Sequence, residues 1–508
     1  MEHPEASRAV HTQGIGTVIT RASGLLLHPT SLPGREPCGT LGHEAFAFAD
    51  FLAAAGQSWW QVLPLGATGF GDSPYQSFSA FAGNPNLVSC DSLVAEGLLP
   101  ASLLPSAAAG VPCDFGAAHA LVQRAGPELA RALTAPPHRD RLEEFRARSP
   151  WLREFAAFMA IRDSLGGASW TRWPEPLRAR EPGALAEATR RLGDEIAAHE
   201  AMQWAFDSQW RALRAHAHAR GVRLFGDAPI FVAHDSSDVW SRPELFDLDA
   251  HGQCRVVAGV PPDYFSETGQ LWGNPLYRWQ AHAAEGFEWW RARLRHALEL
   301  VDLLRLDHFI GFVRHWEIPA GATDARGGHW QPGPGEPLFR ALERDLGSLP
   351  LVAEDLGETG ADVEELRDAL GLPGMRVMHF AFSGDLNHPF LPRNHPENAV
   401  AYAGTHDNDT TRGWWQQLPE RERAFARAQL GESSGDIAWD LIRAGLGSRA
   451  AMFIATVQDA LSLGSEARLN TPGRPSGNWT WRLSPGALDE PLAARLREAT
   501  RASGRLPG

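Results

Sequence analysis

The sequence predicts an α/β fold, specifically a (β/α)8 barrel with large helical and loop insertions at the carboxyl ends of its strands. Three observations lead to this prediction. Eight short apolar runs have the length of a strand, and each stops abruptly in polar or Gly/Pro-rich residues. Helical periodicity separates several of the runs. Most of the runs are nearly continuous in Val, Leu, Ile or Phe, which is typical of parallel strands covered on both faces.

The runs and the helices between them alternate along the chain. The strands are expected at 24–28, 59–65, 222–232, 301–307, 350–355, 375–382, 399–407 and 450–458, although the eighth run could equally be helical. Helices are expected at 43–55, 360–370 and 418–431, with Thr359 as the N-cap of the second. Eight strands that alternate with helices predict closure into a barrel.

Two intervals are too long to be simple crossovers. Residues 67–221 contain helical patterns at 152–165 and 185–220, and residues 233–300 end in a helical pattern near 286–300. We interpret both as insertions that build a substrate site, because long loops follow the carboxyl ends of barrel strands. The chain is then one catalytic unit over 1–508, with a barrel core at about 21–66, 222–232 and 301–500 and insertions at about 67–221 and 233–300.

Composition excludes several classes of protein. A net charge of −14 without a basic stripe disfavours nucleic acid as a partner. No apolar run reaches the length of a membrane span, and the first residues do not resemble a secretory signal. The four cysteines, Cys38, Cys90, Cys113 and Cys254, are too few for a disulfide framework and too dispersed for a zinc site. We therefore expect buried, inert thiols and a cytoplasmic protein.

Three carboxylates stand where predicted strands end. Asp307 closes the run LLRLDHF, and strand alternation places Arg305 on the same side, where it would keep the carboxylate ionised and oriented for nucleophilic attack. Glu354 emerges from the apolar run LVAEDLG, a setting that raises a carboxyl pKa and suits proton donation. Asp407 follows His406 in AGTHDNDT, and this pair can hydrogen-bond adjacent hydroxyls of one sugar ring.

These motifs carry a resemblance to a known family. The sequence resembles the 4-α-glucanotransferases called amylomaltase or disproportionating enzyme, relatives of the α-amylase clan. The matching segments, in order along the chain, are SGLLLHPTSLPG (23–34), WWQVLPLGATGFGDSPYQSFSAFAGNPNL (59–87), GDAPIFVAHDSSDVW (226–240), GVPPDYFSETGQLWGNPLY (259–277), RLDHFIGF (305–312), VAEDLGE (352–358), GTHDNDT (404–410) and NTPGRPSGNWTWR (470–482). Together they span nearly the whole chain.

The resemblance implies a catalytic role for each carboxylate. Asp307 would be the nucleophile that forms a covalent glucosyl-enzyme, and Glu354 would be the acid and base. Asp407 would stabilise the transition state through ring hydroxyls, with His406 assisting, and Arg305 would orient and ionise Asp307. From the residues alone, a lone carboxylate at a strand end is more often a helix cap or a surface ion pair.

The resemblance also implies a set of supporting and substrate-binding residues, each of which has a plainer alternative. Asp227 matches a signature segment of the clan but could be a turn-forming residue, and His308 could cap the barrel rim. The residues expected to contact substrate are Tyr75, Tyr264, Phe265, Trp272 and Asn274. The family usually carries Arg where this chain has Ile310, which puts one nearby contact in doubt. The NWTWR segment is interpreted as structural.

No metal or cofactor is expected, because the DSSD segment at 235–238 lacks the Gly and the terminal Glu of a calcium loop. The expected function is transfer of α-1,4-glucan segments to acceptor glucans or glucose by a retaining double displacement. The alternatives are a retaining α-glucan hydrolase and a non-catalytic glucan-binding protein. The expected partners are α-1,4-glucans and malto-oligosaccharides, with glucose as an acceptor, and the chain is expected to be a monomer.

Overall fold

The core of the protein is a closed barrel of eight parallel strands. The computed structural model describes residues 16, 19–105, 112–136, 138–262, 266–357, 360–431, 434–474 and 476–507. Around the barrel the strand order is β1-β12-β11-β10-β9-β6-β3-β2. The strands are β1 (Ala22–Leu26), β2 (Trp59–Gln61), β3 (Arg223–Pro229), β6 (Leu303–Asp307), β9 (Leu351–Ala353), β10 (Gly374–Val377), β11 (Ala399–Tyr402) and β12 (Met452–Thr456). Each of the eight predicted runs overlaps one of these strands, the uncertain eighth included, although β1 and β10 begin before their predicted runs.

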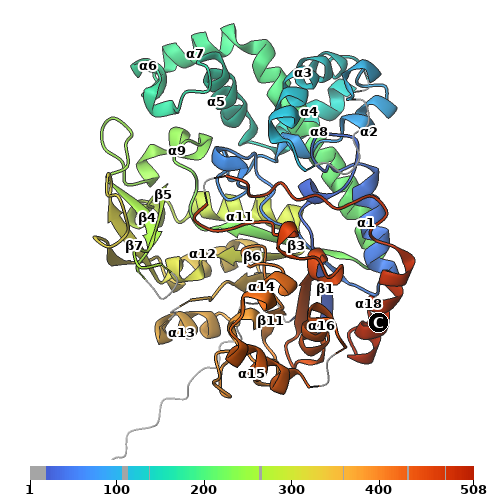
Figure 1. Ribbon diagram of the computed structural model, residues 1–508. Coiled ribbons are helices and arrows are strands. Elements are labelled where there is room, and N and C mark those ends of the chain that lie inside the picture. The colour runs from blue at the N-terminus through green and yellow to red at the C-terminus, as the bar shows by residue number, and fades with distance from the viewer. Residues whose placement is uncertain are drawn as a thin grey trace, which may run out of the picture.

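Helices cover most of the outside of the barrel (Figure 1). They are α1 (His43–Ala54), α8 (Gly193–Ala219), α11 (Glu288–Leu300), α12 (Glu336–Leu346), α13 (Ala361–Ala369), α14 (Thr411–Gln417), α15 (Glu420–Leu430), α16 (Ile437–Gly447), α17 (Val457–Ala460) and α18 (Glu490–Ala502). The predicted N-cap Thr359 lies outside the described residues, and Gly360 directly precedes α13. Between β10 and β11 the described chain forms only short 3-10 turns.

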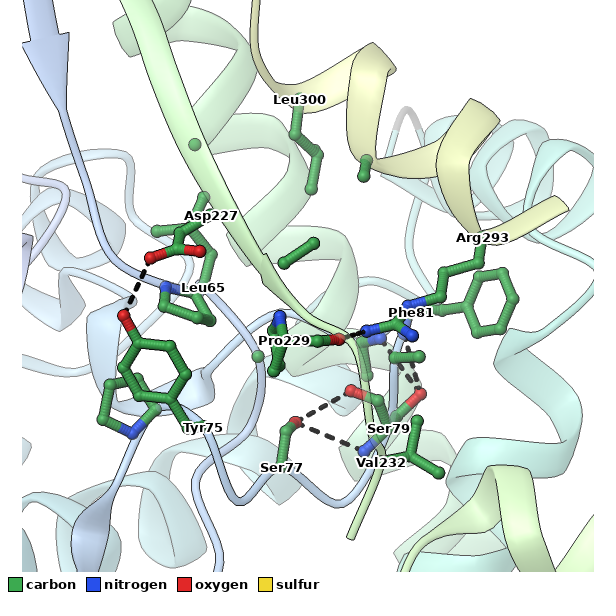
Figure 2. Close-up of a pocket in the computed structure, with 18 of the residues that line it drawn as sticks. Leu65, Tyr75, Ser77, Ser79, Phe81, Asp227, Pro229, Val232, Arg293 and Leu300 are labelled. Atoms are coloured by element: carbon green, nitrogen blue, oxygen red, sulfur yellow. Dashed lines mark hydrogen bonds between the residues drawn. The ribbon is translucent and has the colours of Figure 1, made fainter. Parts of the chain in front are cut away.

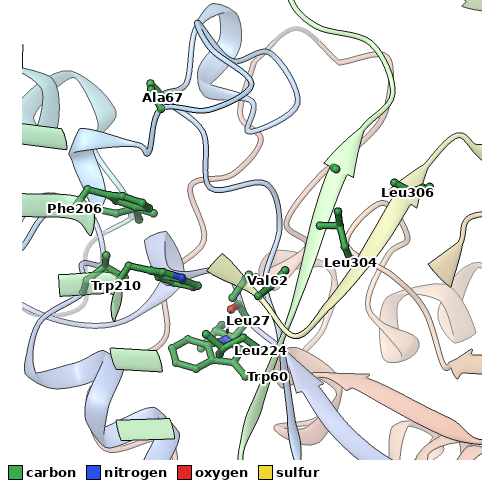
Figure 3. Close-up of a cluster of buried hydrophobic side chains, with 14 of the residues drawn as sticks. Leu27, Trp60, Val62, Ala67, Phe206, Trp210, Leu224, Leu304 and Leu306 are labelled. Atoms are coloured by element: carbon green, nitrogen blue, oxygen red, sulfur yellow. Dashed lines mark hydrogen bonds between the residues drawn. The ribbon is translucent and has the colours of Figure 1, made fainter. Parts of the chain in front are cut away.

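Side chains of the barrel strands alternate between two apolar clusters. Trp59 and Leu303 belong to the smaller cluster, which fills the barrel, whereas their neighbours Trp60 and Leu304 belong to the larger cluster between strands and helices. In that outer cluster the indole of Trp60 donates a 2.8 Å hydrogen bond to the carbonyl of Leu27, and the rings of α8 lie nearby (Figure 3). The alternation directs Arg305 and Asp307 into the barrel, as the sequence predicted.

The first insertion is a helical subdomain built on α8 (Figure 1). It contains α2 (Cys90–Ala95), α3 (Phe115–Ala132), α4 (His138–Arg148), α5 (Leu152–Ser164), α6 (Glu175–Arg178) and α7 (Pro182–Arg191). Helices α3 and α5 pack against α8. Buried Trp210 of α8 donates to the carbonyl of Leu300 at 2.9 Å, so this subdomain is fixed to the barrel helix α11.

The second insertion contributes to a separate antiparallel sheet. Its order is β5-β4-β7-β8, with β4 (Val256–Val260), β5 (Gln270–Pro275), β7 (Arg314–Pro319) and β8 (His329–Pro332). Short helices α9 (Ser237–Ser241) and α10 (Trp279–Ala284) flank the first two strands. The boundaries proposed for the core and the insertions stay predictions, but β7 and β8 fall within the range assigned to the core and pair instead with the second insertion.

The described residues also bear on membrane insertion and on metal binding. Among the described residues, no helix combines the length and the apolar character required to cross a bilayer. The same residues contain no cluster of three or more His, Cys, Asp or Glu side chains that could hold a metal ion. In the DSSD segment, Asp235 pairs with Arg162 at 3.2 Å and Asp238 accepts a 2.8 Å hydrogen bond from the amide of Ala80.

The prediction of four inert thiols is wrong for two of them. Cys38 and Cys113 form a disulfide, although 75 residues separate them. The pairing depends on tertiary contact, because the loop after β1 meets the start of α3, where the amide of Asp114 donates to the carbonyl of Pro37 at 3.0 Å. Burial raises the pKa of the free thiols Cys90 and Cys254 to about 12, so these two are inert. The cytoplasmic location stays a prediction that has lost one of its supports.

The disulfide can be checked by alkylation. Iodoacetamide added to the denatured, unreduced protein should label two of the four cysteines and, after reduction, all four. A Cys38→Ser variant serves as the control, because it should release Cys113 and expose three thiols without reduction. Labelling of all four cysteines before reduction would show that the bond does not form.

Candidate active site

A groove at the carboxyl ends of the barrel strands brings the predicted residues together. Its volume is about 1170 Å³, and Asp307, Glu354 and Asp407 all line it. Segments that follow seven of the eight barrel strands contribute to its walls, as does β5 of the small sheet. The geometric expectation that distant carboxylates converge at one mouth of the barrel is therefore confirmed.

Arg305 holds two of the acidic side chains. Its guanidinium group pairs with Asp227 at 2.7 Å through Nη1 and with Asp307 at 2.7 Å through Nη2. Arg305 and Asp227 are buried, whereas the Asp307 side chain is 27% exposed at the groove. The buried charge of Asp227 is tolerated because Arg305 pairs with it, and the same guanidinium group orients Asp307. Asp227 is therefore a member of a buried ion pair and not the turn residue of the alternative reading.

Glu354 lies beside the nucleophile candidate. The register between β6 and β9 pairs Leu306 with Ala353, so the next residue of each strand carries a carboxylate. The pKa of Glu354 is raised to about 7, mainly by burial; the charge of Arg305 opposes this rise and the charge of Asp307 adds to it. The backbone amide of His308 donates to Glu354 Oε2 at 2.7 Å, which fixes the orientation of the carboxyl group. This carboxyl group can therefore carry a proton near neutral pH.

Asp407 is oriented by the segment that follows β12. Asn470 Nδ2 donates to Asp407 Oδ1 at 2.6 Å, and Arg468 donates to the Asp407 backbone carbonyl at 2.8 Å. His406 Nε2 lies 3.3 Å from Asp407 Oδ2. One carboxylate oxygen is thus held by Asn470, while the 43% exposed side chain still faces the groove.

Tyr75 connects the two ends of this site. Its hydroxyl donates to Asp227 Oδ2 at 2.8 Å and lies 2.8 Å from His406 Nε2. The Tyr75 ring stacks on the ring of His406, with centroids 5.4 Å apart and planes 14° apart. The ring therefore forms a fixed wall of the groove beside the carboxylates.

A second, smaller cavity lies behind this wall. Its volume is about 90 Å³, and most of its lining is apolar (Figure 2). The Tyr75–Asp227 hydrogen bond runs along one side of it, and Phe81 and Arg293 lie on the other (Figure 2). Burial raises the pKa of Asp227, although Arg305 opposes this effect. The apolar backing thus strengthens the ion pairing in front of it, because charges attract more strongly where water is excluded.

On the opposite side, His308 connects the catalytic strand to the small sheet. The ring of Trp272 lies edge-on to the His308 ring with centroids 4.7 Å apart. Burial lowers the pKa of His308 to about 4, so this imidazole is neutral. His308 adopts a left-handed backbone conformation with φ 54°, a strained state that proteins retain at functional sites.

Of the remaining residues named from the sequence, some line the groove and others lie outside the described residues. Asn274 lines the groove, but its amide donates to the carbonyl of Val232 at 2.9 Å and accepts from Gln76 at 3.3 Å. Tyr264 and Phe265 lie outside the described residues. Ile310 is buried in the groove wall. Substrate contact by Tyr75, Trp272 and Asn274 stays a prediction.

Comparison with known proteins identifies the family. A family profile described as 4-alpha-glucanotransferase matches residues 27–489. A 4-alpha-glucanotransferase of Thermus thermophilus is 50% identical over 96% of this chain and 100% of its own length. One from Synechocystis sp. is 46% identical over 96% of this chain and 98% of its own length. The chain belongs to the 4-alpha-glucanotransferase family.

A solved structure agrees with this assignment. The amylomaltase of Streptococcus agalactiae, solved in complex with acarbose, superposes with a TM-score of 0.93 at 38% identity, covering 96% of this chain and all of that one. The predicted family and barrel are both confirmed. The protein is thus a glycosyl-transferring enzyme of the 4-alpha-glucanotransferase type.

Sequence reasoning missed two groove residues of this 4-alpha-glucanotransferase. Trp479, interpreted as structural, lines the groove and lies with its ring centroid 6.1 Å from those of both Tyr75 and His406. Its φ of 66° is rare for a bulky residue and costs about 1–2 kcal/mol, which points to a functional constraint. Asn470, which holds Asp407, stands in a loop 63 residues away. The Gly/Pro-rich composition around 470–479 was the available signal.

The Arg305 bridge yields a test. Arg305→Lys keeps the charge but removes the planar fork, so one ammonium cannot pair with Asp227 and Asp307 in the same geometry. We expect the rate of glucosyl transfer to fall by at least about a hundredfold. Arg367→Lys, which perturbs the ion pair with Asp355 outside the groove, is the matched control and should retain most of the activity. Equal activity of the two variants would contradict the bridging role.

Proposed function

We propose that this chain transfers segments of α-1,4-glucan to the 4-OH of an acceptor glucan or glucose by double displacement with retention. The observation that carries this proposal is the placement of Asp307 and Glu354 on adjacent strands in contrasting surroundings. Asp307 is paired with an arginine, and burial raises the pKa of Glu354 to about 7. A carboxylate oriented by an arginine can serve as the nucleophile, and a carboxyl group that can hold its proton near neutral pH can serve as the acid.

In the first half of the reaction, Asp307 attacks the anomeric carbon of the donor. Its carboxylate forms a bond to that carbon while the glycosidic bond breaks, and Glu354 gives its proton to the departing oxygen. The product of this step is a glucosyl ester on Asp307. The ion pair with Arg305 supports the step, because it fixes the orientation of the attacking carboxylate.

In the second half, an acceptor hydroxyl replaces the ester. Glu354, now ionised, removes the proton from the 4-OH, and the resulting oxygen attacks the anomeric carbon and frees Asp307. Two inversions restore the α configuration. This mechanism requires carboxyl groups only about 5–5.5 Å apart, whereas an inverting enzyme would need about 6.5–9.5 Å.

Asp407 would hold the glucose unit between the two carboxyl groups, and the buried His406 and Asp227 would fix the wall behind that unit. Asp407 has one oxygen free of Asn470, and its partner His406 shares the Tyr75 hydroxyl with Asp227. Such a network can hydrogen-bond adjacent hydroxyls of the sugar ring. These hydrogen bonds strengthen as the ring flattens towards the oxocarbenium-like transition state. Tyr75 would stack on the same glucose.

For transfer to occur in place of hydrolysis, the acceptor hydroxyl must react with the glucosyl ester faster than water does. Aromatic acceptor contacts and a loop that shields the ester are the two physical means. Gln270 and Trp272 support a role of their segment in both, because they line the groove on the side of His308. Malto-oligosaccharides are the proposed substrates, and the acarbose complex of the Streptococcus agalactiae amylomaltase supports them. A monomeric, cytoplasmic enzyme without metal or cofactor remains part of this proposal.

Incubation with maltotriose tests the reaction type. Transfer should produce a ladder of longer chains plus glucose, with little net gain in reducing ends, measured by chromatography and a reducing-sugar assay. The Asp307→Asn variant should lose turnover by at least about 10⁴-fold while still binding oligosaccharide, because the nucleophile is removed with almost no change in shape. Reducing ends that accumulate without a ladder would identify a hydrolase. An Asp307→Asn variant with most of its rate would refute the assignment of the nucleophile.

The pKa of Glu354 predicts a pH profile. This carboxyl must be protonated to act as the acid, so kcat/KM should fall as pH rises through about 7, about tenfold per unit above it. A donor with a fluoride leaving group needs no proton from Glu354, so its kcat/KM should not fall above about pH 7. Glu354→Gln should fail with maltotriose yet release fluoride from the activated donor, whereas exposed Glu364→Gln should behave as wild type. A profile without the basic limb, or an active Glu354→Gln enzyme, would contradict the role.

A further inference from the structure

The groove has an apolar rim that the proposed mechanism does not use. Among the described residues, the exposed large hydrophobic side chains are Leu271, Trp330, Phe380 and Leu386, and the first three line the groove. Trp330 is 38% exposed, although an indole ring ordinarily packs into a core. Exposed apolar side chains that gather along one cavity mark a binding surface.

The ring of Trp330 is held rigid from behind. Trp330 of β8 stands directly opposite Trp316 of β7, and their rings meet edge to face with centroids 5.2 Å apart. The guanidinium carbon of Arg314 lies 5.0 Å from the Trp330 ring centroid. Arg314 is ion-paired with Asp362 of α13, so the small sheet is anchored to the barrel at this point. A preorganised ring loses little freedom when it binds a ligand.

The sheet leads outward from the acid/base carboxyl. At its inner edge, Trp272 of β5 contacts His308, whose amide holds Glu354. Trp330 stands on β8 at the other edge, three strand spacings away in the order β5-β4-β7-β8, or about 14 Å. The strand register places Leu271 and Trp330 in one row across the four strands, through Gly259 and Trp316.

The wall formed by Tyr75, Asp227 and His406 lies on the other side of the carboxylates. That wall holds the donor glucose in the proposed mechanism, whereas Glu354 serves the leaving group and the acceptor. The sheet beyond Glu354 therefore borders the acceptor side of the groove. A single glucose bound beside Glu354 does not reach a ring about 14 Å beyond β5, but a longer chain does.

We propose that Trp330 is a stacking platform for a distal glucose unit of a long α-1,4-glucan acceptor. The apolar C–H face of a pyranose would cover the exposed part of the indole, and Leu271 would extend the same apolar row towards the cleavage point. The inference rests on the proposed function and deepens it, because it makes Trp330 the determinant of preference for long acceptors. Neither Asp307 nor Glu354 depends on this contact.

Acceptor kinetics with a fixed amylose donor test the proposal. For Trp330→Ala, the KM for maltopentaose as acceptor should rise about tenfold, while the KM for glucose should stay within about twofold of wild type. Trp330→Phe, which keeps an aromatic face, should recover most of the affinity for maltopentaose. If KM in Trp330→Ala rises equally for both acceptors, or rises for neither, the proposal is overturned.

A matched control separates this effect from general damage. Trp415 of α14 is also partly buried with an arginine over its ring, Arg427 at 5.3 Å, but it does not line the groove. Trp415→Ala should leave the ratio of the two KM values unchanged even if its melting temperature falls. If the wild-type enzyme transfers to neither glucose nor maltopentaose, the proposed function is refuted, whereas the change in the ratio of the two KM values tests Trp330 alone.

Discussion

The active site depends on one buried arginine. Arg305 pairs with Asp227 and Asp307 at 2.7 Å each, inside a barrel otherwise filled by apolar side chains. Without it, the buried Asp227 would have no charged partner and would lie beside the partly exposed Asp307, and an uncompensated buried charge is strongly destabilising. Because Asp227 also accepts from Tyr75, and Tyr75 contacts His406, the orientation of the opposite wall follows from the same ion pair.

The same interaction separates the properties of the two central carboxyl groups. Asp307 is paired directly with Arg305, whereas Glu354 is held by backbone amides, and its pKa is raised to about 7, mainly by burial. Two chemically similar groups at the ends of neighbouring strands thus have different partners and different surroundings. The difference suits a reaction in which one group must attack and the other must carry a proton.

The barrel provides the framework, and the insertions provide the walls. The parallel strands bring the ends of β6, β9 and β11 to one rim, which is why residues 307, 354 and 407 meet. The small antiparallel sheet is assembled from two separate stretches, one before and one after the catalytic strand β6. It carries Trp272 close to His308 and Trp330 at its outer edge, and it gives the groove an apolar border.

The sequence by itself determined the eight strands, the barrel and the three carboxylates at strand ends, because strand periodicity and strand termini are local properties of the chain. It did not determine contacts between distant segments. Three such contacts join stretches far apart along the chain: the Cys38–Cys113 disulfide, the hydrogen bond from Asn470 to Asp407 and the pairing of β7 with β4. The strained conformation of Trp479 was equally hidden, since φ is imposed there by neighbours from other segments. These features depend on how loops pack, and only the tertiary structure decided them.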